Sequence, residues 1–197
     1  MPDRRDDAAR VHAEDAKAWG DWLERHHATE PGAWLVTWKK KSGRPAPTYE
    51  EGVIEALRFG WVDSTGRALD DEATMLWYAP RKRGSGWARP NKQRIAKLEQ
   101  DGRMAPAGVA VVEAAKADGS WSLLDAVEDL VVPDDLANAF KRHRGSAKQW
   151  EAFPRSAKRG ILEWIVQAKR APTRAKRIEE TARLAADGKR ANQWPRS

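Results

Sequence analysis

The chain has 197 residues and contains no cysteine. This absence excludes a disulfide framework, thiolate metal sites and a cysteine nucleophile. No apolar run approaches the roughly 18 residues that a membrane-spanning helix needs, and the opening residues lack the apolar stretch of a secretory signal. We therefore expect a cytoplasmic protein without a membrane span.

Several sequence motifs of enzymes are also missing. The chain has no phosphate loop, no glycine fingerprint for dinucleotides, no His-Glu-x-x-His and no Gly-x-Ser-x-Gly. The four histidines fall in segments that we expect to be exposed or terminal, where histidine is rarely a metal ligand. We expect no metal and no cofactor. Binding is favoured over catalysis, with an undiscovered enzyme as an alternative.

Positive charge is concentrated near the C-terminus. Residues 1–140 contain 20 Lys or Arg and 24 Asp or Glu, whereas residues 141–197 contain 16 and 5. Such asymmetry indicates either an acidic partner such as nucleic acid or a solvated basic face. The residues that could contact phosphates are Lys169, Arg170, Arg174, Lys176 and Arg177. Acidic residues in the same segment dilute this charge, so the solvated face is favoured.

Hydrophobic periodicity predicts an α+β fold, with a small antiparallel sheet and helices in the N-terminal half and an all-helical C-terminal half. Alternating apolar residues predict strands at 33–40, 61–64 and 73–80. A capping box of Thr48 and Glu51 predicts a helix that ends at Gly60. Further helices are expected at 13–25, 91–99 and 106–117 and, in the C-terminal half, after Ser122, Pro133, Ser146, Ser156 and Pro172.

The domain organisation follows from the same patterns. We expect a disordered N-terminus over residues 1–12, an α+β region over 13–120, a helical region over 121–190 and a tail over 191–197. No linker between the two regions looks long or polar enough to require that they fold separately.

One cluster of polar and aromatic residues stands out near the second and third predicted strands. Its members are Trp61, Asp63, Ser64, Asp71, Arg81, Ser85, Trp87 and Asn91. If the two strands pair, Asp63 and Arg81 approach the same corner, where their charges, a hydroxyl and two indoles would form a small polar pocket. The alternative, favoured from the residues alone, is a structural ion pair in which Asp63 or Asp71 holds Arg81.

Several sequence runs carry a family resemblance. The runs "YEEGVIEALRFGWVDS", "APRKRGSGWARPN", "VPDDLANAF" and "SAKRGILEWIVQAKRAPTRAKRIEETARLAADG" resemble the YdeI/OmpD-associated (OmdA-like) bacterial family over roughly residues 34–189. Two positions depart from the family pattern. Tyr78-Ala79 stands where Phe-Thr is more common, and Ala88 stands where serine is more common.

The resemblance implies protection against bacteriocins and antimicrobial peptides and an association with envelope stress, but no established reaction. It implies that the glycine, tryptophan, aspartate and arginine motifs near the second and third strands form one spatial unit. We therefore expect a non-enzymatic protein that binds a small ligand, a peptide or a protein partner through the corner of Trp61, Asp63, Arg81 and Trp87. A nucleic-acid-binding module built on the basic helices is the alternative.

Overall fold

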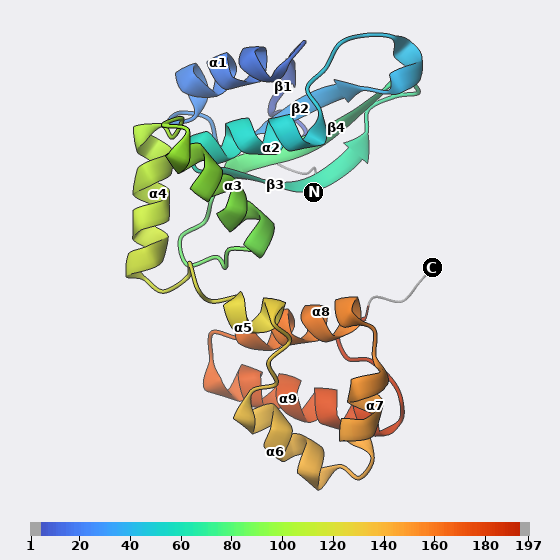
Figure 1. The fold of residues 1–197 in the computed structure, drawn as a ribbon. Helices are drawn as coiled ribbons and strands as arrows, with labels where there is room; N and C mark the ends of the chain where they lie inside the picture. Colours follow the sequence, from blue (N-terminus) through green and yellow to red (C-terminus); the bar gives the residue numbers. More distant parts are fainter. Residues whose placement is uncertain (1–4, 194–197) are drawn as a thin grey trace. The chain divides into compact units, whose positions relative to one another are not determined.

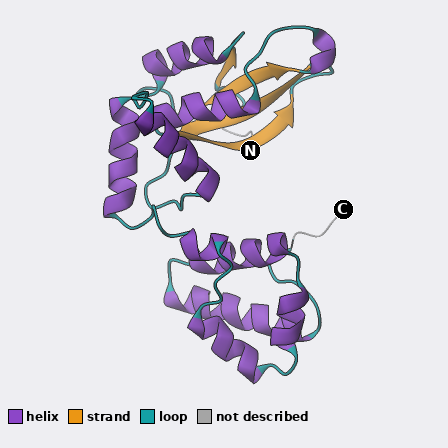
Figure 2. Cartoon of the chain, viewed as in Figure 1, coloured by secondary structure: helices purple, strands orange, loops and turns teal. Residues whose placement is uncertain are grey.

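A computed structural model describes residues 5–193, and the chain divides into two compact units, Met1–Trp121 and Ser122–Ser197. The N-terminal unit combines a four-stranded sheet with helices, and the described part of the C-terminal unit contains helices only (Figures 1 and 2). The chain is therefore α+β. None of the described helices is long and apolar enough to cross a membrane.

The sheet of the N-terminal unit is mixed. Its strands are β1 (Ala9–His12), β2 (Ala33–Trp38), β3 (Trp61–Ala68) and β4 (Ala73–Pro80), in the order β1-β2-β4-β3. β4 pairs antiparallel with both β2 and β3, whereas β1 pairs parallel with β2. The prediction of an antiparallel sheet is therefore wrong for this edge strand.

The strand β1 also corrects the expectation that all of residues 1–12 are disordered. It pairs with β2 from Ala9, opposite Ala33, to His12. Just before it, the indole nitrogen of Trp34 donates a hydrogen bond of 2.8 Å to the carbonyl of Arg5. The composition of this polar segment gives no sign of a strand because its order comes from pairing with β2. Residues 1–4 lie outside the described part of the chain.

The strand β3 is longer than predicted. The sequence predicts a strand to Ser64 followed by a turn, but β3 continues to Ala68. A register shift between Asp63 and Gly66 marks a bulge in its pairing with β4, as a glycine within a strand often does. The turn comes later in the chain. There the Asp70 carboxylate accepts hydrogen bonds from the backbone N–H groups of Glu72 and Ala73.

Four helices complete the N-terminal unit. They are α1 (Ala16–His26), α2 (Tyr49–Arg58), α3 (Arg89–Gln100) and α4 (Pro106–Ala117), with a short 3₁₀ helix η1 (Lys40–Ser42) after β2. The predicted capping box is confirmed, because Thr48 and Glu51 exchange hydrogen bonds at the start of α2. The helix α3 starts at Arg89 with Ala88 as its N-cap, so the predicted start at residue 91 is wrong.

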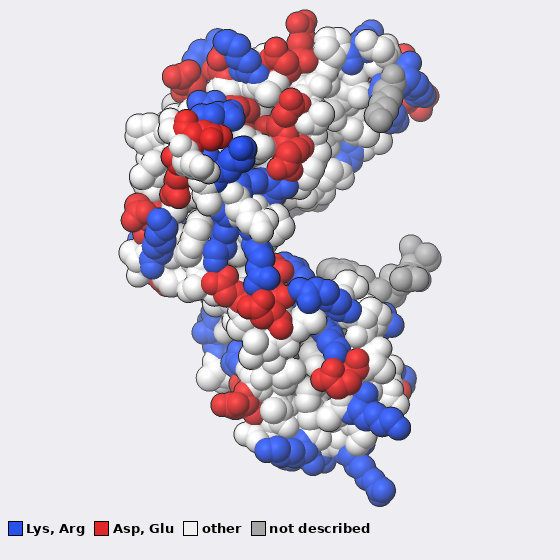
Figure 3. Space-filling view, in the orientation of Figure 1, with Lys and Arg blue, Asp and Glu red and all other residues white. Residues whose placement is uncertain are grey.

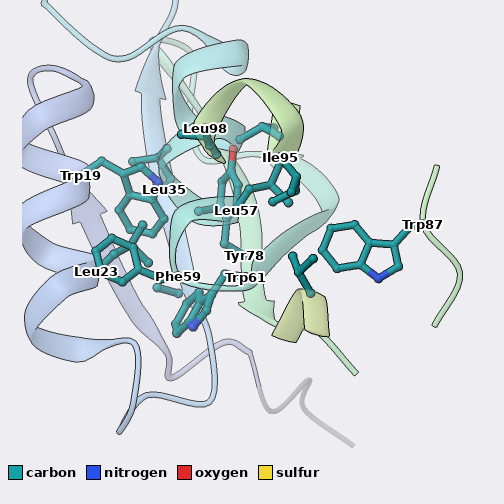
Figure 4. Packing of buried hydrophobic residues seen from close by; sticks show 14 of the residues in the cluster. Trp19, Leu23, Leu35, Leu57, Phe59, Trp61, Tyr78, Trp87, Ile95 and Leu98 are labelled. Atoms are coloured by element: carbon teal, nitrogen blue, oxygen red, sulfur yellow. The ribbon is translucent and has the colours of Figure 1, made fainter. Parts of the chain in front are cut away.

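The main core lies between one face of the sheet and the helices (Figure 4). Trp19 of α1, Leu57 of α2 and Tyr78 of β4 are among its fully buried residues. The polar N–H of a buried tryptophan requires a partner, and Trp19 donates to the carbonyl of Gly52 at 3.1 Å. A smaller cluster covers the other face and includes Trp34, Val36, Ala73, Met75 and Trp77.

The C-terminal unit is built from α5 (Asp125–Glu128), α6 (Asp134–Arg142), α7 (Ser146–Ala152), α8 (Arg155–Val166) and α9 (Ala171–Ala186). Its separate core contains Leu136, Phe140, Trp150, Ile161, Ile165, Ile178 and Ala182. The apolar residues Ile161, Leu162 and Ile165 of α8 are buried, whereas Ala175 of α9 is exposed.

A close approach between α4 and α2 yields a stability prediction. A Cβ atom at Gly108 would lie 2.1 Å from the carbonyl oxygen of Arg58, and a backbone atom has little freedom to move aside. We expect Gly108→Ala to lower the free energy of unfolding of the N-terminal unit by about 1–3 kcal/mol, as overpacking does. Calorimetric and urea unfolding of the purified chain would measure the change.

The matched control is Gly160→Ala in the middle of α8, where a Cβ atom would meet nothing within 4 Å. Because alanine has the higher helix propensity, this variant should gain up to about 1 kcal/mol. Equal effects of the two substitutions would contradict the packing argument.

Candidate functional site

The loop after β4 forms a pocket of about 210 Å³ against helix α4. Arg81, Lys82 and Arg83 supply a cationic wall from the loop. The opposite wall is apolar, because α4 contributes Ala110, Val111, Ala114 and Ala115. We call this cavity the Arg81 pocket. A cavity with one charged and one apolar wall suits a ligand that combines the same two properties.

Arg81 is held by the loop and pairs with no carboxylate in the described part of the chain. Its guanidinium carbon lies 3.9 Å from the ring centroid of Trp87, and one terminal nitrogen donates to the carbonyl of Gly86. Its Nε is buried without a hydrogen-bond partner among the described residues. Burial lowers the pKa of Arg81 to about 10, against the opposing charge of Asp63, so Arg81 is still a cation at neutral pH.

The Trp87 ring is the platform beneath this guanidinium. Trp87 is 1% exposed, and its ring centroid lies 5.0 Å from that of Trp121. The ammonium groups of Lys92 and Lys116 lie 5.3 Å and 5.7 Å from the Trp121 ring. Cations over aromatic faces are attracted by the ring quadrupole, so these aromatic rings help to hold the loop.

The two serine hydroxyls and the carboxylate that line the pocket are already engaged. Ser85 donates from Oγ to the carbonyl of Lys82 at 2.6 Å, which closes the turn of the loop. Hydrogen bonds from Ser120 lower the pKa of Asp118, and Arg83 lies 3.6 Å from its carboxylate. A lowered pKa is the opposite of what a general acid needs.

Asp63 and Asn91 belong to a second polar group, which lies toward α2 and α3. The Tyr49 hydroxyl donates to Asp63 at 3.0 Å. Arg94 donates to both carboxylate oxygens of Glu50, at 2.8 and 2.5 Å, and to Asn91 at 2.8 Å. The hydrogen bonds from Arg94 lower the pKa of Glu50, so this group is a set of satisfied polar contacts.

The structure therefore brings only part of the predicted cluster into one pocket. Arg81, Ser85 and Trp87 line it, whereas Trp61 lies in the core, where its N–H donates to the carbonyl of His27 at 3.2 Å. Figure 4 shows the indoles of Trp61 and Trp87 at separate places in the buried cluster.

The remaining two predicted residues do not contribute to the pocket. Ser64 is exposed on β3, and Asp71 lies in the turn at the far end of the β3–β4 hairpin from Arg81. The ion pair that the sequence suggested between Arg81 and Asp63 or Asp71 does not form among the described residues. An antiparallel hairpin of this length places residues of its turn and of its open end far apart.

The sequence reasoning missed the α4 wall. In α4, Val109 is 43% exposed, and Val112 and Ala115 are among the buried positions. The sequence did contain a sign of this wall, because α4 is apolar on more than one face. A helix at the edge of a core needs only one apolar face. Such excess apolar surface can indicate a binding wall.

The basic residues of the C-terminal helices are only partly free to meet a partner. Arg174 donates two hydrogen bonds to Asp135, at 2.7 and 3.0 Å. Arg177 donates to the carbonyl of Trp164 and lies 4.9 Å from its ring. Lys169, Arg170 and Lys176 are exposed. On the face that Figure 3 shows, Lys and Arg are interspersed with Asp and Glu and with uncharged surface.

Comparison with known proteins gives two family matches. Residues 129–188 match the family described as Bacteriocin-protection, YdeI or OmpD-Associated (OmdA), which confirms the family resemblance in the C-terminal unit. Residues 11–111 match the family described as Domain of unknown function (DUF8412). No curated protein and no solved structure matches the chain. The DUF8412 match spans more than half of the length of the chain. The chain therefore belongs to the DUF8412 family, and it carries an OmdA match in its C-terminal unit.

Proposed function

We propose that this protein binds a small organic anion with an apolar body in the Arg81 pocket, and that this binding contributes to protection against bacteriocins in the bacterial cytoplasm. The protective role rests on the description of the family that matches residues 129–188. The binding role rests on one observation: Arg81 is a cation stacked on buried Trp87, without a carboxylate partner and with an unused Nε donor.

An anion fits this site for an energetic reason. Burying a charged guanidinium without a counter-ion is unfavourable, and a ligand carboxylate or phosphate would supply the missing counter-charge. Arginine is suited to such acceptors because its planar donors match their geometry. Lys82 and Arg83 on the same wall add to the favourable potential, while the alanines of α4 accommodate an apolar ligand body.

Binding fits the pocket better than catalysis. The Ser85 hydroxyl is turned to the backbone of its own loop, and the residues that line the pocket include no histidine. Asp118 has a lowered pKa, so it is poorly suited to act as a proton donor or as a base near neutral pH. No group on the wall is activated as a nucleophile requires.

The nucleic-acid alternative has weaker support. Two of its five candidate residues, Arg174 and Arg177, are engaged inside the C-terminal unit. The 16 Lys and Arg residues of the basic segment also share their unit with acidic residues from 125–135, some of which pair with them. Affinity for nucleic acid that falls steeply with salt would revive it.

The first test uses octanoate as the anionic probe. Wild-type protein should bind octanoate with shifts in the backbone amide signals of residues 81–87 and of α4 in a nitrogen-15 spectrum. Arg81→Gln removes the charge-assisted hydrogen bond, which is worth about 1.5–3 kcal/mol, so the Kd should rise about 10- to 150-fold. Titration calorimetry would measure both constants.

Arg83→Gln is the matched control, because it removes the same charge from the same wall. Arg83 is exposed and faces Asp118, so its loss should change the Kd only slightly, as for exposed ion pairs. If both variants raised the Kd for octanoate equally, the binding would be explained by general attraction between opposite charges. An unchanged Kd in Arg81→Gln would refute the assignment of the site. Thermal melting of both variants would confirm that they remain folded.

A second prediction concerns protection in cells. Bacteria that depend on this protein for survival of a cationic peptide should lose that protection with Arg81→Gln and keep it with Lys176→Gln, an exposed change on α9. Survival counts at matched protein levels would measure the effect. The reverse pattern would instead support a function of the basic helices.

A further inference from the structure

The Arg81 pocket is small for a site that encloses a whole ligand. Its volume of about 210 Å³ lies below the roughly 300–1,000 Å³ of typical small-molecule sites. An anionic group with a short apolar chain fills such a space, so the rest of a larger ligand lies outside it. The surface next to the pocket therefore indicates what kind of ligand the protein takes.

That surface is an uncharged stripe on helix α4. Ala110 and Ala114 line the pocket, and Ala117 continues the same stripe beyond the lining. All three residues are exposed. Residues spaced four and then three positions apart lie on one face of a helix, and alanine side chains leave room for another chain to lie against it. The stripe thus suits a ligand that extends out of the pocket as an uncharged chain.

A second arginine of the same unit shows how a tryptophan-stacked cation receives a carboxylate. The Arg67 guanidinium carbon lies 4.3 Å from the ring centroid of buried Trp34. The Nε of Arg67, like that of Arg81, is buried without a hydrogen-bond partner among the described residues. At Arg67, however, the Asp6 carboxylate lies 2.9 Å from a terminal nitrogen. The two sites therefore differ in the counter-ion, which a segment of polypeptide supplies at Arg67.

The backbone next to the Asp6 carboxylate is held at the same place. The carbonyl of Arg5 accepts a hydrogen bond of 2.8 Å from the Trp34 indole, and the Arg5 side chain donates to Thr65 at 3.4 Å. An arginine stacked on tryptophan thus accommodates a carboxylate together with the peptide chain that carries it. This precedent within the fold favours a peptide as the source of the carboxylate at Arg81.

The lining of the Arg81 pocket favours the end of a peptide over an internal acidic residue. Its three cations, Arg81, Lys82 and Arg83, accompany a single acid, Asp118, which is already engaged by Ser120 and lies 3.6 Å from Arg83. An internal residue needs two stretches of chain to leave the pocket, whereas a terminal residue needs only one. In a cavity of this size the chain end is the better fit.

We infer that the anion bound in the Arg81 pocket is the C-terminal carboxylate of a peptide that ends in an apolar residue. The last side chain lies against Val111 and Ala115 of the apolar wall, and the preceding residues lie along Ala114 and Ala117. Capture of a terminal carboxylate is a recurring mode of peptide recognition. This inference rests on the proposed function and names the class of its ligand.

The test titrates three N-acetylated peptides into the nitrogen-15-labelled full chain. They are Ala-Ala-Leu with a free carboxylate, the same peptide with a C-terminal amide, and Ala-Asp-Leu amide, whose only carboxylate is internal. The free acid should saturably shift the amides of residues 81–87 and of α4, with nuclear Overhauser contacts to the methyl group of Ala117. Both amidated peptides should have a Kd about 10- to 150-fold higher, the ratio expected for one charge-assisted hydrogen bond.

Arg81→Gln tests whether the preference for the free acid comes from this cation. In that variant the free acid and its amide should bind with equal Kd, because the carboxylate has lost its partner. Arg67→Gln is the matched control, since it removes the other tryptophan-stacked guanidinium and should leave the preference intact. The same spectra report whether each variant is folded, and the comparison of peptides with the unchanged chain depends on neither variant.

Equal Kd values for the free acid and its amide, or equally tight binding of the internal carboxylate, would overturn the inference. A preference for the free acid that survives Arg81→Gln would overturn it as well. Octanoate binding through Arg81 without binding of any peptide would refute this inference alone and leave the proposed binding of a small anion standing. Absence of binding by both octanoate and the free-acid peptide would refute both.

Discussion

The stacking of Arg81 on the Trp87 ring is the contact on which the pocket depends. It holds the loop after β4 in place, because the guanidinium reaches both the ring and the carbonyl of Gly86 in the same loop. Trp87 in turn packs against Trp121 at the end of the N-terminal unit. An ion pair at Arg81 would hold the loop equally well but would consume the charge. A ring holds the cation and leaves its charge without a counter-ion.

The helices and strands could be predicted largely from local patterns. The capping box of Thr48 and Glu51 and the proline at the start of α4 each marked a helix start that the structure has. The strand β1 could not be predicted, since its four residues are ordered by pairing with β2, a contact of long sequence separation. The length of β3 was missed for a related reason, because its bulge is defined only by its partner strand.

The candidate site was predictable in its residue types and less so in its geometry. Arg81 and Trp87 are close in sequence, so proximity alone was enough to associate them. Predicting the position of Asp63 required the register of β3 against β4. A bulge in a strand changes which of its residues share a face. The α4 wall required knowledge of which face of an apolar helix meets the core. Tertiary packing decides which face of the helix meets the core. Sequence periodicity cannot predict it when both faces are apolar.

The position of Asp63 explains how buried Arg81 stays charged without an ion pair. Its carboxylate accepts a hydrogen bond from Tyr49 and acts on Arg81 only through its charge, without an ion pair. A closer carboxylate would neutralise Arg81, and a more distant one would leave the buried cation less stabilised. At this intermediate separation Asp63 favours the charged form of Arg81 while its own hydrogen bond is made to Tyr49.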